Sequence, residues 1–465
     1  MKPVSVSDIL KAAGGTLLCG NAEAEVSHIS IDSRDVPAGT LFVPIVGEKV
    51  DAHRFLPDVV RLGAAAALTA EKPEEEGWYR DGQTALILVG DTLRALQDLG
   101  AWFRREHPIP IVGITGSVGK TTTREMVAAA LSAGFRTYKT PGNSNSQIGV
   151  PLTLSEIGED DEIAVIEMGM SIPGEMPRLS RMVRPDAAIM TNIGDAHIQQ
   201  LGSREGILRE KAHITDDMPD GGRVFLNADD PLLRACQPDS RLVPVWYGTD
   251  PSLGNYAKDI RMVNGCASFT AVVSGKEVPV SLSVYGKHQV LNAMAALSAA
   301  DAYGVPLKGA AEKLGLFRGF KHRQQVLTHN GVTVIDDSYN ASPASMKAAL
   351  DILKEIGTPG KRIAVLADMK ELGPDEKALH LDVGRYIADG DRADVLLTLG
   401  DLAKEIARGF ALGSGGDKVI RSYDTIVELE EALHGYAVPG SFVLFKGSNS
   451  MKLSAPADRM SGNAE

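Results

Sequence analysis

A glycine-rich segment, TGSVGKTTT, holds the residues best suited to chemistry. Gly116 and Gly119 would let backbone N–H groups approach an anion closely. Lys120 would add a positive point charge, and the hydroxyl of Thr121 could bind Mg²⁺. The apolar residues before the segment predict a β-strand and those after it predict a helix, the context that a phosphate-binding loop requires. We therefore predict a nucleoside triphosphate site; the alternative is a turn that contains Gly-Lys-Thr by chance.

Three polar residues further along the chain could serve a metal that accompanies the triphosphate. Glu167 closes the apolar strand IAVIE, where a carboxylate can bind Mg²⁺. His197 follows the apolar strand AAIMTNI, and Lys211 lies in the predicted helix REGILREKAHI. Taken singly, each has an ordinary alternative: a solvated strand end, a loop histidine and a lysine on a helix surface.

The elements that must position these residues predict an α/β protein of three domains, at residues 1–90, 91–317 and 318–465. The central domain alternates strands and helices, with a less regular β-rich stretch at 241–285. We therefore expect a mostly parallel sheet covered by helices. After the basic cluster FRGFKHR the alternation restarts, which predicts a third domain of doubly wound, Rossmann-like type.

The first domain is expected to be a small α/β unit. Its patterns predict a serine-capped helix over 7–13, strands within 26–34 and 40–46, and a helix over 53–62. A strand at 84–89 then leads to Asp91, a good helix N-cap, and apolar residues recur at helical spacing until Pro108. We expect this last helix to link the first two domains.

Composition excludes several classes of protein. Lys and Arg number 48 and Asp and Glu 60, so the net charge of −12 argues against general attraction to nucleic acid or to an anionic membrane. No signal-peptide core and no run of 18 apolar residues occurs, so we expect a cytoplasmic protein without a membrane span. Cys19, Cys236 and Cys266 match no metal or redox spacing. The acidic segment 73–77 predicts a solvated loop.

Taken together, the motifs resemble those of the Mur ligase family. The chain contains, in the family's order, TGSVGKTTT, EMGM, TNIGDAH, Lys211, an HxxxN spacing that ends at Asn292, HR at 322–323 and DDSYNASPASM. The resemblance covers nearly the whole chain. It implies a small N-terminal domain that binds a nucleotide-sugar, a central P-loop ATPase domain and a C-terminal Rossmann-like domain.

The resemblance also implies a site for ATP and two Mg²⁺ ions. The catalytic residues would be Lys120, Lys211, His197 and Arg323. ATP would contact Gly116, Ser117, Gly119, Lys120, Thr121, Thr122, Asn292, Arg323, Asp337, Tyr339 and Asn340. The Mg²⁺ ligands would be Thr121, Glu167, His197 and a carbamylated Lys211, because a neutral amine can take up CO₂ and become an anionic ligand. The alternative for 336–340 is a hinge and a turn.

Within the family, four segments most resemble ligases that add D-alanyl-D-alanine to UDP-N-acetylmuramoyl-tripeptide: TPGNSNSQIGVPLTL, GSREGI, DDSYNASPASM and KGSNSMK. Both compounds would be small-molecule substrates of a monomeric enzyme of peptidoglycan precursor synthesis. Ser33 and Arg34, in IDSR, would contact the uridine diphosphate, which an Arg fork suits; the alternative is an exposed turn. Thr140, Asn143 and Asn145 would line the cleft for the muramoyl-peptide.

Two positions depart from the family's pattern, and three other functions remain open. Asn449 stands where the pattern has Arg, and Gln289 stands where many relatives have Asn. Another Mur-type ligase would share the ATP site, although the chain has no DNPR-like segment for the third amino acid. A folylpolyglutamate synthetase would need no uridine pocket. A P-loop switch protein would have no use for His197 and Lys211.

Overall fold

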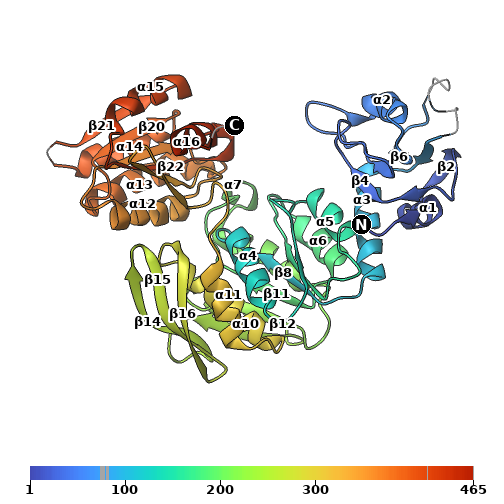
Figure 1. Ribbon diagram of the computed structural model, residues 1–465, viewed down its shortest axis with the longest axis horizontal. Helices are drawn as coiled ribbons and strands as arrows, with labels where there is room; N and C mark the ends of the chain where they lie inside the picture. Colours follow the sequence, from blue (N-terminus) through green and yellow to red (C-terminus); the bar gives the residue numbers. More distant parts are fainter. Residues whose placement is uncertain (74–78, 80–82, 416, 464–465) are drawn as a thin grey trace.

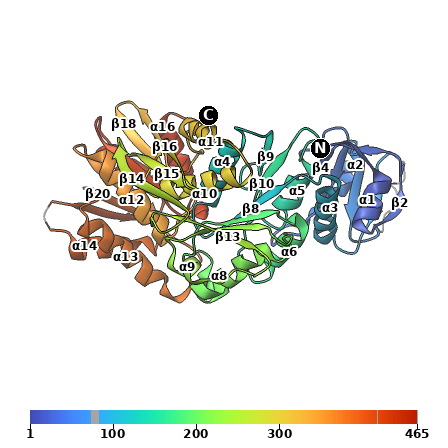
Figure 2. The ribbon, with the colours of Figure 1, turned by 90° about the horizontal axis from the view of Figure 1, so that it is seen from below.

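The computed structural model describes residues 1–73, 79, 83–415 and 417–463. The chain forms three lobes, each built around its own sheet, which are separated in the view of Figure 1. In the view of Figure 2 the first and third lobes lie at opposite ends of the molecule. Apart from Pro73, the acidic segment expected to be a solvated loop lies outside the described residues. The α/β fold class predicted from the sequence is confirmed.

The first lobe contains a five-stranded sheet in the order β2-β7-β6-β5-β4. Its elements are β1 (Val4–Ser5), α1 (Val6–Ala13), β2 (Thr16–Cys19), β3 (Glu25–Val26), β4 (His28–Ser30), β5 (Thr40–Phe42), α2 (Leu56–Arg61), β6 (Ala66–Thr69) and β7 (Ala85–Leu88). The helix expected over 7–13 begins one residue earlier, because the Ser5 hydroxyl caps it by accepting from the backbone N–H of Asp8. The strands expected in 26–34 and 40–46 are present but shorter.

Helix α3 (Thr92–Glu106) connects the first and second lobes. The Asp91 side chain accepts from the backbone N–H of Arg94, which confirms the expected N-cap. Leu96, Leu99 and Phe103 are buried in the apolar core of the first lobe. Gly100, also on α3, contacts Pro151 of the second lobe so closely that a Cβ there would lie 2.7 Å from the Pro151 Cα. The helix therefore packs against both lobes.

The second lobe contains a nine-stranded sheet in the order β16-β15-β14-β13-β12-β11-β8-β10-β9. Strands β8 to β14 run parallel, and β15 and β16 extend the sheet antiparallel. The elements are β8 (Ile111–Thr115), α4 (Lys120–Leu131), β9 (Thr137–Lys139), α5 (Gly149–Ser155), β10 (Ile163–Glu167), α6 (Glu175–Val183), β11 (Ala187–Met190), α7 (Ile198–Leu201), α8 (Arg204–Ala212), β12 (Arg223–Asn227), α9 (Pro231–Ala235), β13 (Val243–Gly248), β14 (Asn255–Val263), β15 (Cys266–Val273), β16 (Lys276–Tyr285), α10 (Gln289–Ala302) and α11 (Leu307–Leu316). The irregular stretch at 241–285 is this antiparallel extension.

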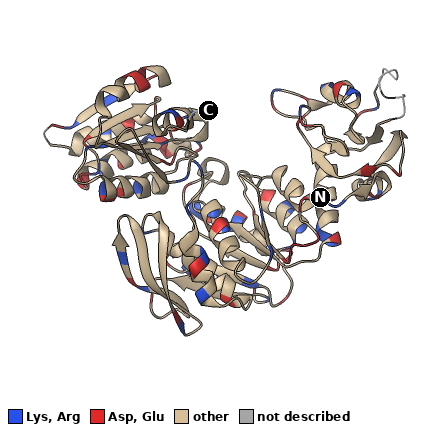
Figure 3. Cartoon of the chain, viewed as in Figure 1, with Lys and Arg blue, Asp and Glu red and all other residues tan. Residues whose placement is uncertain are grey.

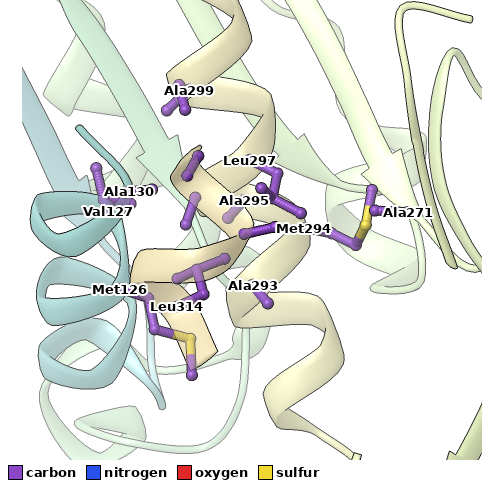
Figure 4. Close-up of a cluster of buried hydrophobic side chains, with 14 of the residues drawn as sticks. Met126, Val127, Ala130, Ala271, Ala293, Met294, Ala295, Leu297, Ala299 and Leu314 are labelled. Carbon is purple, nitrogen blue, oxygen red and sulfur yellow. The ribbon is translucent and has the colours of Figure 1, made fainter. Parts of the chain in front are cut away.

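Alternate residues of the parallel strands pack into different cores, one on each face of the sheet. In β10, Val165 joins the core beneath α4, α10 and α11, whereas Ile166 joins the core beneath α5 and α6. Burial on both faces explains the continuous apolar runs in the sequence. Alanines dominate α10, so this helix packs against Met126 and Val127 of α4 and Leu314 of α11 (Figure 4). Strand β8 and helix α4, which flank the glycine-rich segment, therefore belong to a closely packed core.

The third lobe contains a six-stranded sheet in the order β17-β18-β22-β19-β20-β21, parallel except for β17. Its elements are β17 (Gln325–His329), β18 (Val332–Asp336), α12 (Pro343–Gly357), β19 (Arg362–Ala367), α13 (Glu376–Asp389), β20 (Val395–Leu399), α14 (Ala403–Gly413), β21 (Val419–Tyr423), α15 (Ile426–Tyr436), β22 (Phe442–Lys446) and α16 (Ser454–Ser461). Cores on both faces of the sheet confirm the doubly wound prediction.

The helices, the cysteines and the distribution of charge each bear on an expectation drawn from the composition. Within the described ranges, no helix has both the length and the apolar character needed to cross a bilayer. The three cysteines are free thiols. Lys and Arg residues are interspersed with Asp and Glu residues over all three lobes (Figure 3). Phosphate groups would therefore have to be bound by a local site rather than by a broad basic surface.

Candidate active site

A cavity of about 340 Å³ lies where the second and third lobes meet. It is formed by the loop before α4, the carboxyl end of β10, the start of α10 and the segment between β18 and α12. Of the residues selected from the sequence, it is lined by Ser117, Gly119, Lys120, Thr121, Thr122, Asn145, Glu167, His197, Asn292, Arg323, Asp337, Tyr339 and Asn340. Thus residues more than 200 positions apart in the chain meet in one place.

The phosphate-binding loop between β8 and α4 is held by the segment after β11. The backbone N–H of Val118 donates to Asn192 Oδ1 at 2.9 Å, and the hydroxyl of Thr191 donates to the Val118 carbonyl at 2.7 Å. A Cβ on Gly116 would lie 1.9 Å from Thr191 Oγ1, so the close approach requires glycine. Gly119 has a φ of +82°, which also favours glycine. These contacts and the two glycines therefore hold the loop in its conformation.

Glu167 is buried and lies at the centre of a polar network. Its Oε1 accepts from the Thr121 hydroxyl at 3.2 Å and from Asn145 Nδ2 at 2.7 Å. Its Oε2 accepts from Arg124 Nη1 at 3.1 Å, and this arginine also pairs with Glu125. Carboxylate and hydroxyl oxygens side by side are the ligands that Mg²⁺ prefers. Glu167 and Thr121 therefore fit a magnesium site.

Lys211 and Lys120 meet at one carbonyl oxygen. Lys120 Nζ donates to the Gly116 carbonyl at 2.8 Å, and Lys211 Nζ donates to the same oxygen at 3.0 Å. Burial, reinforced by the charge of Lys120, lowers the pKa of Lys211 well below its ordinary value. Burial also lowers the pKa of Lys120. Lys211 thus has the environment of a neutral amine rather than that of a helix-surface lysine.

His197 enters the cavity from the N-terminal end of α7. Its Nδ1 lies 2.6 Å from the Glu371 carboxylate of the third lobe. Burial lowers the pKa of His197, and the charges of Lys120 and Lys211 lower it further, while Glu371 opposes them. The favoured state is therefore a neutral imidazole, the form in which histidine binds metals. This form suits a metal ligand, and the role of His197 as one stays a prediction.

The wall from the third lobe carries the residues expected to reach the nucleotide. The Arg323 guanidinium stacks on the Tyr339 ring at 4.0 Å, and within the described part of the chain its buried Nε has no hydrogen-bond partner. Lys446 Nζ pairs with Asp337 Oδ2 at 2.5 Å and donates to the Asn340 carbonyl at 3.0 Å. The buried Arg323 Nε, together with Lys120 on the opposite wall of the cavity, suits an anionic ligand such as a nucleotide phosphate.

Asn292 joins the phosphate-binding helix to the hinge before β17. Thr123 Oγ1 donates to Asn292 Oδ1 at 3.0 Å, and Asn292 Nδ2 donates to Gln289 Oε1 at 2.8 Å. Gln289 in turn donates to Gln324 at 2.9 Å. The glutamine that departs from the family's pattern therefore extends the network rather than breaking it.

Four of the selected residues lie outside the walls of the cavity, in addition to Gly116 and Lys211 behind the loop. Thr140 is fully buried, and its Oγ1 accepts from the backbone N–H of Glu167 at 2.9 Å, so it positions that residue. Asn143 is exposed. Ser33 and Arg34 lie in the first lobe, where Arg34 is exposed and pairs with Asp32 at 2.6 Å. Contact of these four residues with a substrate stays a prediction.

Sequence reasoning missed three residues that shape the site: Arg124, Glu371 and Lys446. Arg124 lies in α4, one position after the threonines of the motif, and is buried. From helical spacing alone, an arginine at this position would be expected on a solvated face. Lys446 is the last residue of β22, and Glu371 lies in the loop that follows the carboxyl end of β19. Ligands of open parallel sheets bind at that edge, so the rule that we applied to Glu167 could have identified both.

Comparison with protein families gives three consecutive matches along the chain. The family model described as "Mur ligase family, catalytic domain" matches residues 25–104, "Mur ligase middle domain" matches 114–300, and "Mur ligase, glutamate ligase domain" matches 322–449. Each match falls largely within one lobe. The middle match contains the phosphate-binding loop, and the third begins at the hinge residue before Arg323.

Known relatives match the chain over most of its length. The UDP-N-acetylmuramoyl-tripeptide–D-alanyl-D-alanine ligase of Bacillus subtilis is 38% identical, covering 97% of this chain and 96% of the relative. The Escherichia coli ligase of the same name is 32% identical over 89% of each chain.

Solved structures are similar along the whole fold. MurF from Acinetobacter baumannii has a TM-score of 0.88 and 28% identity over 99% of each chain. MurF from Thermotoga maritima in complex with ADP has a TM-score of 0.81 and 27% identity, covering 94% of this chain and 98% of that one. Because sequence relatives above 30% identity and the family models agree over nearly all of its length, this chain belongs to the Mur ligase family.

Proposed function

We propose that this protein is an ATP-dependent ligase that joins D-alanyl-D-alanine to the peptide carboxylate of UDP-N-acetylmuramoyl-tripeptide, in the cytoplasmic synthesis of peptidoglycan precursors. One observation carries the proposal: the phosphate-binding loop faces Arg323 across one cavity, and the buried Arg323 Nε has no hydrogen-bond partner among the described residues. The relatives named above, which bear the name of this ligase, supply the substrates. The enzyme releases ADP and phosphate.

The chemistry requires activation of a carboxylate, because oxide is a poor leaving group. A carboxylate oxygen of the tripeptide attacks the γ-phosphorus of ATP, and the bond between that phosphorus and the bridging oxygen of ADP breaks. The product is an acyl phosphate. The neutral amine of D-alanyl-D-alanine then attacks the acyl carbon, loses a proton and expels phosphate. Because both partners in the first step are anionic, the site must neutralise charge around one phosphoryl group.

The described residues can divide this work among them. The loop N–H groups and Lys120 bind the β- and γ-phosphates, and Arg323 approaches the γ-phosphate from the third lobe. Asn292 would hold the adenine edge, Asp337 the ribose, and Tyr339 and Asn340 the neighbouring parts of the nucleotide. Thr121, Glu167, His197 and a carbamylated Lys211 would hold two Mg²⁺ ions, which when bound stabilise the charge on the phosphates.

The second substrate site is proposed to extend from the cavity toward the first lobe. Asn145 lines the cavity beside Glu167, and the exposed Asn143 precedes it in the same loop. Ser33 and Arg34 would bind the uridine diphosphate at the far end, so the muramoyl-peptide would span the space between the lobes. We propose that one chain suffices for this arrangement and that the enzyme is a monomer.

An omission assay tests the proposal. Phosphate release is measured with ATP, UDP-N-acetylmuramoyl-tripeptide and D-alanyl-D-alanine together, and then with each compound left out in turn. Phosphate release should require all three. Release that continues at the full rate without D-alanyl-D-alanine, or that requires glutamate and a folate instead, would reject the proposed reaction.

A further inference from the structure

The loop that follows β19 extends from the third lobe to the predicted metal ligand His197. Glu371 Oε2 lies 2.6 Å from His197 Nδ1, and the Glu371 carbonyl accepts from the backbone N–H of Gln199 at 3.4 Å. Figure 1 shows α7, which begins after His197, beside the third lobe. We propose that Glu371 is a positioning residue that keeps the His197 proton on Nδ1 and so leaves Nε2 free to bind a metal. This inference rests on the proposed function, because the metal that His197 would bind is part of that function.

The tautomer follows from the donor and acceptor chemistry of the pair. A deprotonated carboxylate can only accept, so the Nδ1 that contacts it must carry the hydrogen. A neutral imidazole has one N–H, and its lone pair is then on Nε2. His197 lines the cavity that also contains Glu167 and Thr121. Nε2 is therefore the nitrogen that remains available to a ligand in that cavity.

The backbone at both ends of this contact is unusual. His197 has a φ of +64° and Glu371 has a φ of +65°, the left-handed region that residues with a Cβ seldom adopt. Such conformations persist only where the surrounding structure imposes them, and they gather at functional sites. Two such residues that meet through their side chains, from separate lobes, indicate a contact that the fold is built to make.

The third lobe holds this loop firmly. His380 Nε2 accepts from the backbone N–H of Met369 at 2.9 Å, and its Nδ1 donates to the Glu376 carbonyl at 2.6 Å. The Ser448 N–H donates to the Asp368 carbonyl at 3.0 Å. Glu371 is thus carried by the rigid carboxyl edge of the third sheet. The orientation of His197, a residue of the second lobe, therefore depends on the position of the third lobe.

The carboxylate of Glu371 would affect His197 as a metal ligand. In the described structure it is in direct contact with the imidazole ring, with Oε2 2.6 Å from Nδ1. A carboxylate that accepts from a ligating histidine fixes its ring and strengthens it as a ligand, and loss of such a partner typically lowers metal affinity about 10- to 100-fold. We therefore expect an effect of this size when Glu371 is replaced.

The tautomer can be read in the intact, metal-free protein by ¹⁵N NMR of labelled histidine, with the His197 signal assigned by its loss in His197→Gln. In the wild type the signal should show protonated Nδ1. Glu371→Ala should shift the proton toward Nε2, whereas Glu371→Gln, whose amide oxygen can still accept, should retain much of the wild-type pattern. Asp375→Ala is the matched control, because this exposed carboxylate in the same loop does not cap α13 with its side chain. An unchanged His197 signal in Glu371→Ala would overturn the proposal.

Binding of Mn²⁺ in the presence of ADP, followed by electron paramagnetic resonance, gives a second readout. Glu371→Ala should weaken Mn²⁺ about 10- to 100-fold while ADP binding without metal stays the same, and Glu371→Gln should recover most of the loss. Equal Mn²⁺ affinity in wild type and Glu371→Ala, or an equal loss of metal-free ADP binding, would contradict the role of Glu371. A wild-type protein that binds no Mn²⁺ with ADP would instead reject the metal site of the proposed function, and the NMR result would still stand by itself.

Discussion

Lys211 shows how burial changes the chemistry of a common residue. An ordinary lysine, with a pKa near 10.4, is too protonated to hold CO₂, but burial and the nearby Lys120 shift Lys211 toward the neutral amine. We predict that Lys211 is carbamylated. Carbon-13 NMR after addition of labelled bicarbonate, with nucleotide and Mg²⁺, should show a carbamate signal in the wild type. Lys211→Arg, whose guanidinium stays charged, should lack that signal and be nearly inactive. If the wild type and Lys211→Arg gave the same spectrum and the same rate, the carbamate prediction would be wrong and Lys211 would have only a structural role.

Lys120 should be essential for turnover. Its ammonium lies in the phosphate-binding loop, where charge builds up on the transferring phosphoryl group. Lys120→Ala is expected to lower kcat by about 10²-fold or more, the scale of losing one preorganised electrostatic contact. Steady-state phosphate release checks this, with Lys313→Ala on the exposed surface of α11 as the control. A folded Lys120→Ala protein with wild-type turnover would disprove the assignment of the loop.

Arg34 should act on one substrate and not on the other. It lies in the first lobe, away from the residues that line the cavity. Arg34→Ala should therefore raise KM for the UDP-linked substrate and leave KM for ATP nearly unchanged. Arg61→Ala removes an exposed arginine of the same lobe, also paired with an aspartate, and should change neither constant. If Arg34→Ala raised KM for ATP alone, the first lobe would have no role in binding the uridine end.

At the scale of elements, the sequence predicts best where local pattern and tertiary burial agree. The strand, loop and helix around Lys120 could be predicted because apolar periodicity and the glycine motif coincide there. Glu167 could be placed because it ends a continuous apolar strand. Arg124 could not, because the acidic groups that pair with it come together only when α4 packs on β10. The short strands of the first lobe have blurred limits, since three or four residues carry little periodicity.

The loop after β19 gives a prediction about pH. Burial lowers the pKa of His380, and protonation would place two donors face to face at the Met369 N–H. As pH falls, His380 therefore binds its proton at a higher pH in the unfolded chain than in the folded one. The free energy of unfolding should for this reason decrease below about pH 6.5. Asp368 and Glu376 oppose this lowering, and Lys370 adds to it.

Urea denaturation of the wild type and His380→Gln at pH 7.5 and 5.5 measures the effect. His380→Gln should lose less stability than the wild type between the two pH values, because the glutamine does not titrate. The pKa of His197 and His288 is lowered as well, so part of the dependence should remain. His434→Gln removes an exposed histidine of the same lobe and should behave like the wild type. An identical loss in His380→Gln and wild type would contradict this explanation.

At the scale of the whole molecule, the relative placement of the lobes is what the sequence leaves open. Local patterns predicted three units, and among the described residues the three sheets of five or more strands agree with that number, but the limits at residues 90 and 317 stay predictions. Helix α3 illustrates the difficulty, since one of its faces belongs to the first core and Gly100 to the contact with the second lobe. No local pattern specifies that Glu371 of the third lobe contacts His197 of the second, because this contact depends on long-range packing.

Closure of the molecule around its substrates is expected. The second and third lobes already share a cavity, whereas the first lobe, with Ser33 and Arg34, is separated from the third lobe in Figure 1. Closure would exclude water from the acyl phosphate. Solution scattering should give a smaller radius of gyration with an ATP analogue and the UDP-linked tripeptide than with neither. An unchanged radius at saturating ligand would mean that the active site is preassembled.

The span of chain that lines the cavity, from Ser117 to Lys446, has a consequence for biosynthesis. Domains generally fold from the N-terminus during translation. A nascent chain that has emerged only as far as α11 already possesses the phosphate-binding loop, Glu167 and Lys211 but lacks the wall opposite them. The ribosome must therefore add well over a hundred residues before the cavity can close on a nucleotide, and a chain that terminates early in the third lobe carries a phosphate-binding loop without the groups that would make it an enzyme.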